Sequence, residues 1–483
     1  MVFAPIFRAG QLPLSYAILQ VCAVLALLLA LWNPTTGGLT KRELTAAALL
    51  LLFPLLYLVP VPGAVMDWLP GREPYAAALA LLDHQELSAP IRLSLFPAET
   101  VSAWLMLLIP VGVFLGTRML DHKRLYRLVQ VLIGIACVQA ILGLMQFGAG
   151  RESPLYLGMT FTSFGSAVGT YPNRNHLAGL IEMVLPITLA LYIYNLGRTE
   201  RQGTHGWKSR VVFFASMRGH IAFVYGALAL LLIIGVIFTR SRTGIALTML
   251  GMLLVTFAFA RRIGGDNVYG PAGTVVAFAV GIGIVIGLAP ILDRFATLDP
   301  LENSRLTMAS ATMDGISAFS PIGSGPGTFA NVFHAFQPLE LGRWFIDHAH
   351  NDYLQWLFEG GALAALLILL LLGLYFFQWR KVWTQAAWSK FRFIQVGAGI
   401  GIFLLVLHEL VDYNLSKPAN MVYFAFLVGI FFSPPDKDAS PGPRRSGKRR
   451  GSSQTQAVLP TADSKAVKPL APAPDQIKNP FAD

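Results

Sequence analysis

Apolar runs of about twenty residues recur from near residue 14 to residue 432, separated by short polar segments. Each run is long enough to cross the hydrocarbon core of a bilayer as a helix, and the alternating strands of an outer-membrane barrel are absent. The pattern predicts an all-α polytopic membrane protein with about eleven transmembrane helices, within a range of about 10 to 12. The predicted spans are 14–32, 45–60, 100–120, 125–147, 176–196, 221–240, 243–260, 274–292, 361–378, 393–414 and 419–432.

The longest polar stretch, at about 293–359, interrupts this pattern and is predicted to be a loop carrying short helices. Within it, residues 304–319 place Leu306, Ala309, Met313 and Ile316 on one helical face. We therefore expect an amphipathic helix along the membrane surface.

Charged residues make up only 13% of the chain, and their distribution predicts its orientation. One alternate set of loops collects most lysines and arginines, and by the positive-inside rule these loops face the cytoplasm. The 293–359 loop is then extracytoplasmic. The net charge of +11 reflects topology and the C-terminal tail, so it does not indicate nucleic-acid binding. The basic residues of the cytoplasmic set are Lys41, Arg42, Arg118, Lys123, Arg124, Arg127, Arg198, Arg201, Lys208, Arg210, Arg218, Arg261, Arg262, Arg380, Lys381, Lys390 and Arg392.

Two domains follow from this organisation: a transmembrane domain over 1–433 and a tail over 434–483. The tail is rich in Pro, Ser, Ala, Lys and Arg, carries a basic run at 444–450 and has no apolar periodicity. We predict that it is disordered and cytoplasmic. Its basic run either contacts anionic lipid headgroups or remains solvated.

Polar clusters suited to chemistry gather on the predicted outer side, whereas the cytoplasmic loops contain no P-loop. Arg240 and Arg242 flank a tight turn between two spans, where a cation needs a partner. With Arg305 of the polar loop they are predicted to bind a diphosphate, because guanidinium donates paired hydrogen bonds to phosphate oxygens. Snorkelling to headgroups or an internal ion pair is the alternative.

The glycine-rich run at 323–327 is predicted to form a tight turn, and an anion-binding loop is the second interpretation. Successive backbone N–H groups suit an anion, but Pro326 removes one donor and no Walker pattern follows.

His350 is the candidate general base, because its imidazole ends the polar loop at the membrane boundary. His348 or Asp352 is a candidate to orient it, although a helical spacing of two argues against direct pairing. A metal site formed by these three residues is the competing interpretation. It ranks lower, because it requires an extended segment and has no HExxH or cysteine partner.

Four motifs together resemble the O-antigen ligase and polymerase superfamily, and a fifth resembles its closing motif. They cover the chain from about residue 94 to the tail. The motifs are Tyr-Pro-Asn-Arg-Asn-His-Leu-Ala at 171–178, Thr-Arg-Ser-Arg-Thr-Gly at 239–244, Gly-Ser-Gly-Pro-Gly-Thr-Phe at 323–329, His-Asn-Asp-Tyr-Leu-Gln at 350–355 and His-Glu-Leu-Val-Asp-Tyr-Asn-Leu at 408–415 with Pro-Ala-Asn at 418–420.

The resemblance implies a multi-pass glycosyltransferase of the bacterial inner membrane, active on the periplasmic side without metal or other cofactor. Its implied partners are an undecaprenyl-diphosphate-linked glycan and a hydroxyl acceptor on a glycan, on lipid A-core or on a protein. It maps the family histidine onto His350 and diphosphate-binding arginines onto Arg240 or Arg242 and Arg305. The further residues predicted to bind substrate are Asn173, Asn175, His176, Asn351 and Asp352 of these motifs and the neighbouring His348.

Three functions remain open from the sequence. They are ligation or polymerisation of a surface polysaccharide such as O-antigen or exopolysaccharide, protein O-glycosylation by the same chemistry, and transport of a lipid-linked or anionic solute. One-sided polar clusters argue against transport, because transporter sites lie near the bilayer midplane.

Overall fold

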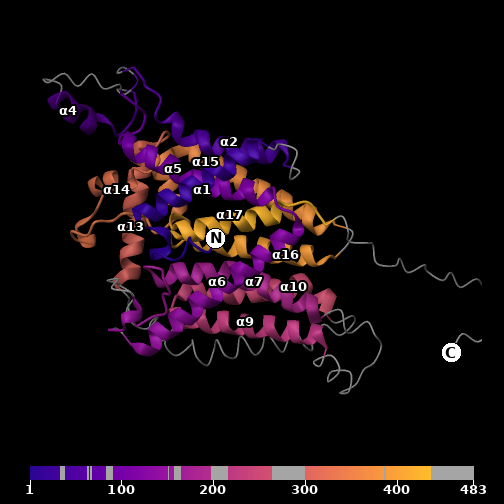
Figure 1. Cartoon of the computed structure of the whole chain (residues 1–483). Coiled ribbons are helices and arrows are strands. Elements are labelled where there is room, and N and C mark those ends of the chain that lie inside the picture. Colours follow the sequence, from indigo (N-terminus) through magenta and orange to yellow (C-terminus); the bar gives the residue numbers. More distant parts are fainter. Residues whose placement is uncertain are drawn as a thin grey trace, which may run out of the picture. The chain divides into compact units, whose positions relative to one another are not determined.

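A computed structural model describes residues 1–32, 39–62, 65, 68–82, 91–150, 152–156, 165–196, 216–263, 300–385 and 388–436. These residues form helices joined by turns, with one isolated bridge between Pro60 and Arg92. The long helices are α1 (Pro13–Trp32), α2 (Lys41–Leu56), α4 (Glu73–Leu82), α5 (Pro97–Arg118), α6 (His122–Ala149), α7 (Arg174–Leu196), α9 (Met217–Thr239), α10 (Arg242–Ile263), α13 (Pro300–Phe319), α15 (Asp352–Trp383), α16 (Lys390–His408) and α17 (Pro418–Phe432) (Figure 1).

The predicted class, an all-α polytopic membrane protein, is confirmed. Eight helices are long and apolar enough to cross a membrane: α1, α5, α6, α7, α9, α10, α15 and α16. Two further predicted spans correspond to the shorter helices α2, with 16 residues, and α17, with 15. The span predicted at 274–292 and most of the predicted tail, from residue 437, lie outside the described residues.

One predicted span is too long. The span expected at 393–414 ends at His408, and residues 409–417 form turns and the 3-10 helix η7 (Asn414–Ser416). Glu409, Asp412 and Asn414 are buried polar residues in this segment, which we call the 409–417 loop. Their side chains need polar partners from other segments, and the turns direct them there.

The core is organised around α7 and α16, which are buried along almost their whole length and pack against each other. Two glycines on one face of α16 make this approach possible. A Cβ atom at Gly401 would lie 2.4 Å from the Met183 carbonyl oxygen, and one at Gly397 would lie 2.8 Å from Ile187 Cα. Small residues at such crossings let helix backbones meet in membranes. Helices α9 and α10 also pack on α7 (Figure 1).

Contacts sort the loops into two ends of the helices. At one end, Arg118 forms a buried ion pair with Glu43 at 3.2 Å, and His122 Nε2 lies 3.0 Å from the Pro434 carbonyl oxygen. At the other end, Tyr57 donates hydrogen bonds to the carbonyl oxygens of Ile322 and Gly360. Several loops predicted to be cytoplasmic therefore meet at one end, and the polar motifs lie at the other.

The helix predicted over 304–319 is present within α13, but its packed face differs from the predicted one. Met308, Ala311 and Phe319 are buried in a cluster with Phe329 and Phe358. Two residues of the predicted apolar face are instead exposed, Leu306 by 74% and Met313 by 49%. The helix packs instead through Met308, Ala311 and Phe319, and Gly315 leaves room for the Phe358 ring.

Replacing Gly401 with leucine is expected to destabilise the protein by about 1–3 kcal/mol or more, because the side chain would overlap the backbone of α7. The melting temperature of the purified protein in detergent should fall clearly. Gly373→Leu is the matched control, since a Cβ atom at Gly373 of α15 meets nothing within 4 Å. Equal melting of the two variants would contradict the close contact.

Candidate active site

The glycine-rich run folds as the predicted turn, with Gly323, Gly325 and Gly327 at φ values of 86°, 117° and 81°. Its backbone donors are already occupied by a carboxyl group of the protein itself. The Glu359 carboxylate accepts hydrogen bonds from Gly327 N at 2.9 Å and Phe329 N at 3.1 Å. The turn therefore fastens the residues before α15 to the first turns of that helix.

A kink at Gly361 completes this attachment. Gly361 has φ 51° and ψ −139°, and an added Cβ atom would meet the Pro321 carbonyl oxygen at 2.0 Å. Ala362 N donates to the same carbonyl oxygen at 2.8 Å. Only glycine fits this conformation and this approach without strain. The kink sets the direction of the first part of α15, which follows His350.

Replacing Glu359 with alanine should therefore loosen the glycine turn. The loss of two buried hydrogen bonds is expected to cost about 1–3 kcal/mol. Hydrogen exchange at the amides of Gly327 and Phe329 should accelerate, and the melting temperature should fall. Glu340→Ala is the control, because Glu340 is exposed on the same side. Unchanged exchange at both amides would disprove this role of Glu359.

The segment before α15 delivers His350 in a constrained conformation. His350 has φ 51°, the left-handed region that costs energy for a residue with a side chain. The next residue, Asn351, caps the helix by accepting a hydrogen bond from Leu354 N at 3.0 Å, and its amide donates to the Leu410 carbonyl oxygen at 2.8 Å. Asp352 N donates to the Glu409 carbonyl oxygen at 3.0 Å. The 409–417 loop thus holds His350 from the side.

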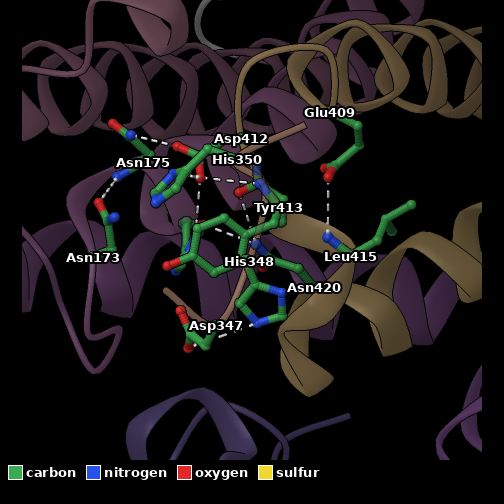
Figure 2. Close-up of polar contacts among 12 residues, drawn as sticks. Asn173, Asn175, Asp347, His348, His350, Glu409, Asp412, Tyr413, Leu415 and Asn420 are labelled. Carbon is green, nitrogen blue, oxygen red and sulfur yellow. Dashed lines mark hydrogen bonds and ion pairs between the residues drawn. The ribbon is translucent and has the colours of Figure 1, made fainter. Parts of the chain in front are cut away.

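Asp412 of this loop is the centre of the site (Figure 2). Its carboxylate is buried and faces side chains from three other parts of the chain, in addition to its neighbouring backbone. The contacts are a hydrogen bond from the Asn175 amide, His350 Nδ1 to Oδ1 at 3.5 Å, His176 Nε2 to Oδ1 at 3.8 Å, Arg305 Nη2 to Oδ2 at 3.5 Å and a hydrogen bond from Tyr413 N at 3.0 Å.

The charge of Asp412 is stabilised by these neighbours. Burial by itself raises the pKa of a carboxyl group, yet the imidazoles of His176 and His350 outweigh burial and hold the pKa of Asp412 well below its usual range. Asp412 is therefore ionised at neutral pH. A buried carboxylate at ion-pair distance from an imidazole can fix its ring and stabilise the imidazolium that forms when the histidine accepts a proton.

Tyr413 arranges the imidazoles around its ring. The His348 ring stacks on it with centroids 4.3 Å apart, whereas the rings of His350 and His176 meet it edge-on at 4.6 Å and 5.0 Å. His348 Nδ1 also lies 3.3 Å from Gln355 Oε1. Burial, with the charge of Lys417, lowers the pKa of His348 to about 4. His348 is therefore neutral at pH 7.

Asp352, the other residue considered as a partner for His350, faces Glu409 instead. Burial first, and then the charge of Asp352, raise the pKa of Glu409 well above its usual range. The carboxylate at ion-pair distance from His350 is thus Asp412, which lies in a motif noted in the sequence but was not singled out there. Asn175, whose amide contacts Asp412, also donates its backbone N–H to Asn173 Oδ1 at 2.9 Å.

The three candidate arginines occupy different positions. Arg305, on α13, reaches Asp412. Arg240 is exposed, in the left-handed conformation, with its guanidinium carbon 5.2 Å from the centroid of the Phe147 ring. Arg242 begins α10, whose Gly244 packs closely on Ala178 of α7. The Arg240–Arg242 turn therefore lies beside the first turn of α7, which carries Asn175 and His176. Among the described residues, no group of three or more histidine, cysteine or acidic side chains is arranged to hold a metal ion.

Residues 227–369 match the family model described as O-antigen ligase. The chain carries an O-antigen ligase domain. The match confirms the resemblance to the ligase and polymerase superfamily and indicates glycosyl transfer of the ligase or polymerase type, with a lipid-linked glycan and an acceptor as partners in general. A search of curated proteins found no match. Within the chain, the domain includes Arg305 and His350, whereas Asp412 lies beyond its end.

If Asp412 positions His350 of the O-antigen ligase domain, Asp412→Asn should lower kcat for glycosyl transfer by about 10²-fold or more, because asparagine keeps the volume but not the charge. The KM values should change little, and the acid limb of the pH–rate profile should move. Asp314→Asn is the control, because Asp314 is exposed on α13. A purely structural role for Asp412 would leave the pH profile in place.

Proposed function

We propose that the protein transfers a glycan from an undecaprenyl-diphosphate carrier to a hydroxyl acceptor at the periplasmic face of the inner membrane. The observation that carries this proposal is the sharing of Asp412 by His350 and Arg305. Asp412 Oδ1 lies 3.5 Å from His350 Nδ1, and Asp412 Oδ2 lies 3.5 Å from Arg305 Nη2. A base and a cation therefore lie next to the same carboxylate. An attacking hydroxyl and a diphosphate leaving group need this combination.

In the proposed reaction, His350 removes the proton from the acceptor hydroxyl. The acceptor oxygen forms a bond to the anomeric carbon, while the bond from that carbon to the diphosphate oxygen breaks and its electron pair leaves with the diphosphate. Attack opposite the leaving group inverts the configuration. Arg305, with Arg240 or Arg242 beside the start of α7, stabilises the charge that grows on the departing phosphate.

Asp412 has a defined part in this scheme. Because its pKa is held low, it remains an anion throughout and favours protonation of His350 as the hydroxyl loses its proton. It also balances Arg305 when no diphosphate is bound. Asn173, Asn175, His176, His348, Asn351 and Asp352 bind or frame the substrate, and the proposed chemistry uses no metal. The proposed sidedness follows from the positive-inside rule.

Replacing His350 with alanine should lower kcat by about 10²- to 10⁴-fold, the usual contribution of a general base. The assay is transfer from a lipid-diphosphate-linked glycan in proteoliposomes. Arg305→Gln should lower kcat as well as raise KM for the donor, because it removes both a phosphate ligand and the charge that stabilises the departing diphosphate. His334→Ala is the matched control: His334 is an exposed histidine of the same segment that contacts Gln337. Full activity of a folded His350→Ala variant would refute the mechanism.

The same assay separates the acceptor classes. Transfer to a glycan or to lipid A-core favours ligation or polymerisation, whereas transfer to serine or threonine of a protein favours O-glycosylation. Movement of the intact donor across the membrane without transfer would support the transport alternative instead.

A further inference from the structure

The first ten residues pack at the end of the helices that carries the candidate active site, although they precede all predicted spans and the O-antigen ligase domain. Ala4 and Ala9 are fully buried. The Thr170 hydroxyl donates a hydrogen bond to the Pro5 carbonyl oxygen, and the Tyr423 hydroxyl donates to the Met1 carbonyl oxygen at 3.2 Å. The segment is therefore packed between the loop before α7 and the first turns of α17.

Its end is held in an unusual backbone conformation. Arg8, Ala9 and Gly10 are consecutive left-handed residues, with φ values of 48°, 56° and 83°. Gly10 packs so closely on α17 that an added Cβ atom would lie 3.0 Å from Pro418 Cβ. Residues with side chains adopt this region at an energetic cost, which persists only where surrounding contacts impose it. Here those contacts fix Arg8, whose side chain is exposed, beside the start of α17.

The residue before Pro418 is Lys417, a second cation. Only 4% of Lys417 is exposed, and its Nζ atom lies 4.5 Å from the centroid of the Tyr413 ring. His348 and Lys417 therefore both contact the Tyr413 ring. Within the described part of the chain, no carboxylate lies at ion-pair distance from Lys417 or Arg8. Burial, opposed by Asp347, Asp412 and Asp352 and reinforced by Arg8, lowers the pKa of Lys417 to about 8.

Burial of Lys417 carries a desolvation cost that the charges of Asp347, Asp412 and Asp352 offset only in part, and the charge of Arg8 adds repulsion to it. An anion bound between Lys417 and Arg8 would relieve both costs. The buried cation and the strained segment that brings the second cation to it are independent features of the fold, and they point to the same place.

We propose that Arg8 and Lys417 bind a phosphate or carboxylate group of one substrate beside the Tyr413 ring. The proposal rests on the proposed function only in taking the ligand to be a substrate of glycosyl transfer. This anion site is distinct from Arg305, which contacts Asp412. Its ligand is either the donor diphosphate or an acidic group of the acceptor, and both present the same chemistry to the two cations.

The experiment compares Arg8→Gln and Lys417→Gln with the wild-type protein in proteoliposomes, measuring KM for donor and acceptor separately. Loss of one charged hydrogen bond should raise one of the two KM values about tenfold or more, with little change in kcat. A rise for the donor identifies the diphosphate, and a rise for the acceptor identifies an acidic acceptor. Arg343→Gln is the matched control, because Arg343 is an exposed arginine of the same end.

Arg8 is exposed, so its variant should fold even if the Lys417 variant does not. Unchanged KM values for both substrates in a folded Arg8→Gln protein would overturn the proposal. A second measurement is independent of activity: inorganic phosphate should raise the melting temperature of the wild type, and Arg8→Gln should need a higher phosphate concentration for the same shift. If the wild type transfers no glycan, the proposed function fails, and this titration alone decides whether the anion site exists.

Discussion

The site depends on the burial of one carboxylate. Removing Asp412 from water is costly, and the cost is recovered only because an amide, two imidazoles and a guanidinium surround it. These groups come from the start of α7, the segment before α15 and the second turn of α13. The carboxylate therefore specifies how three distant parts of the chain meet. The glycine-mediated contact between α7 and α16 supplies the rigid support on which the 409–417 loop stands.

The same carboxylate serves both the base and the cation of the proposed chemistry. A base that accepts a proton becomes a cation, and a nearby arginine that binds diphosphate is already one. Asp412 lies between them and offsets both charges from a buried position, whereas Arg305 and His350 are partly exposed. Glu359 has a comparable structural part, since it occupies the donors of the glycine turn and so directs α15 toward His350. Two buried acids thus hold the loop that carries the candidate base.

Sequence periodicity predicted most of the fold, because apolar runs and loop charges are local properties. The glycine spacing predicted the turn at 323–327, and the choice of His350 as the base stays a prediction. Sequence reasoning did not identify Asp412 as the partner of His350, since that contact joins residues 62 positions apart (412 − 350) and depends on how α16 ends. The end of the span predicted at 393–414 was wrong for a related reason: apolar residues flank the polar ones of the 409–417 loop. The position of residues 1–10 left no local signal apart from the glycine at position 10.

A double-mutant cycle on His350 and Asp412 decides whether Asp412 acts on glycosyl transfer through His350. The measured quantity is kcat for His350→Ala, Asp412→Asn and the double variant in proteoliposomes, each with its melting temperature. If Asp412 acts through His350, the double variant should be about as active as His350→Ala alone, so that the two losses are strongly non-additive. Losses that multiply would show that the two residues act independently and would contradict the account.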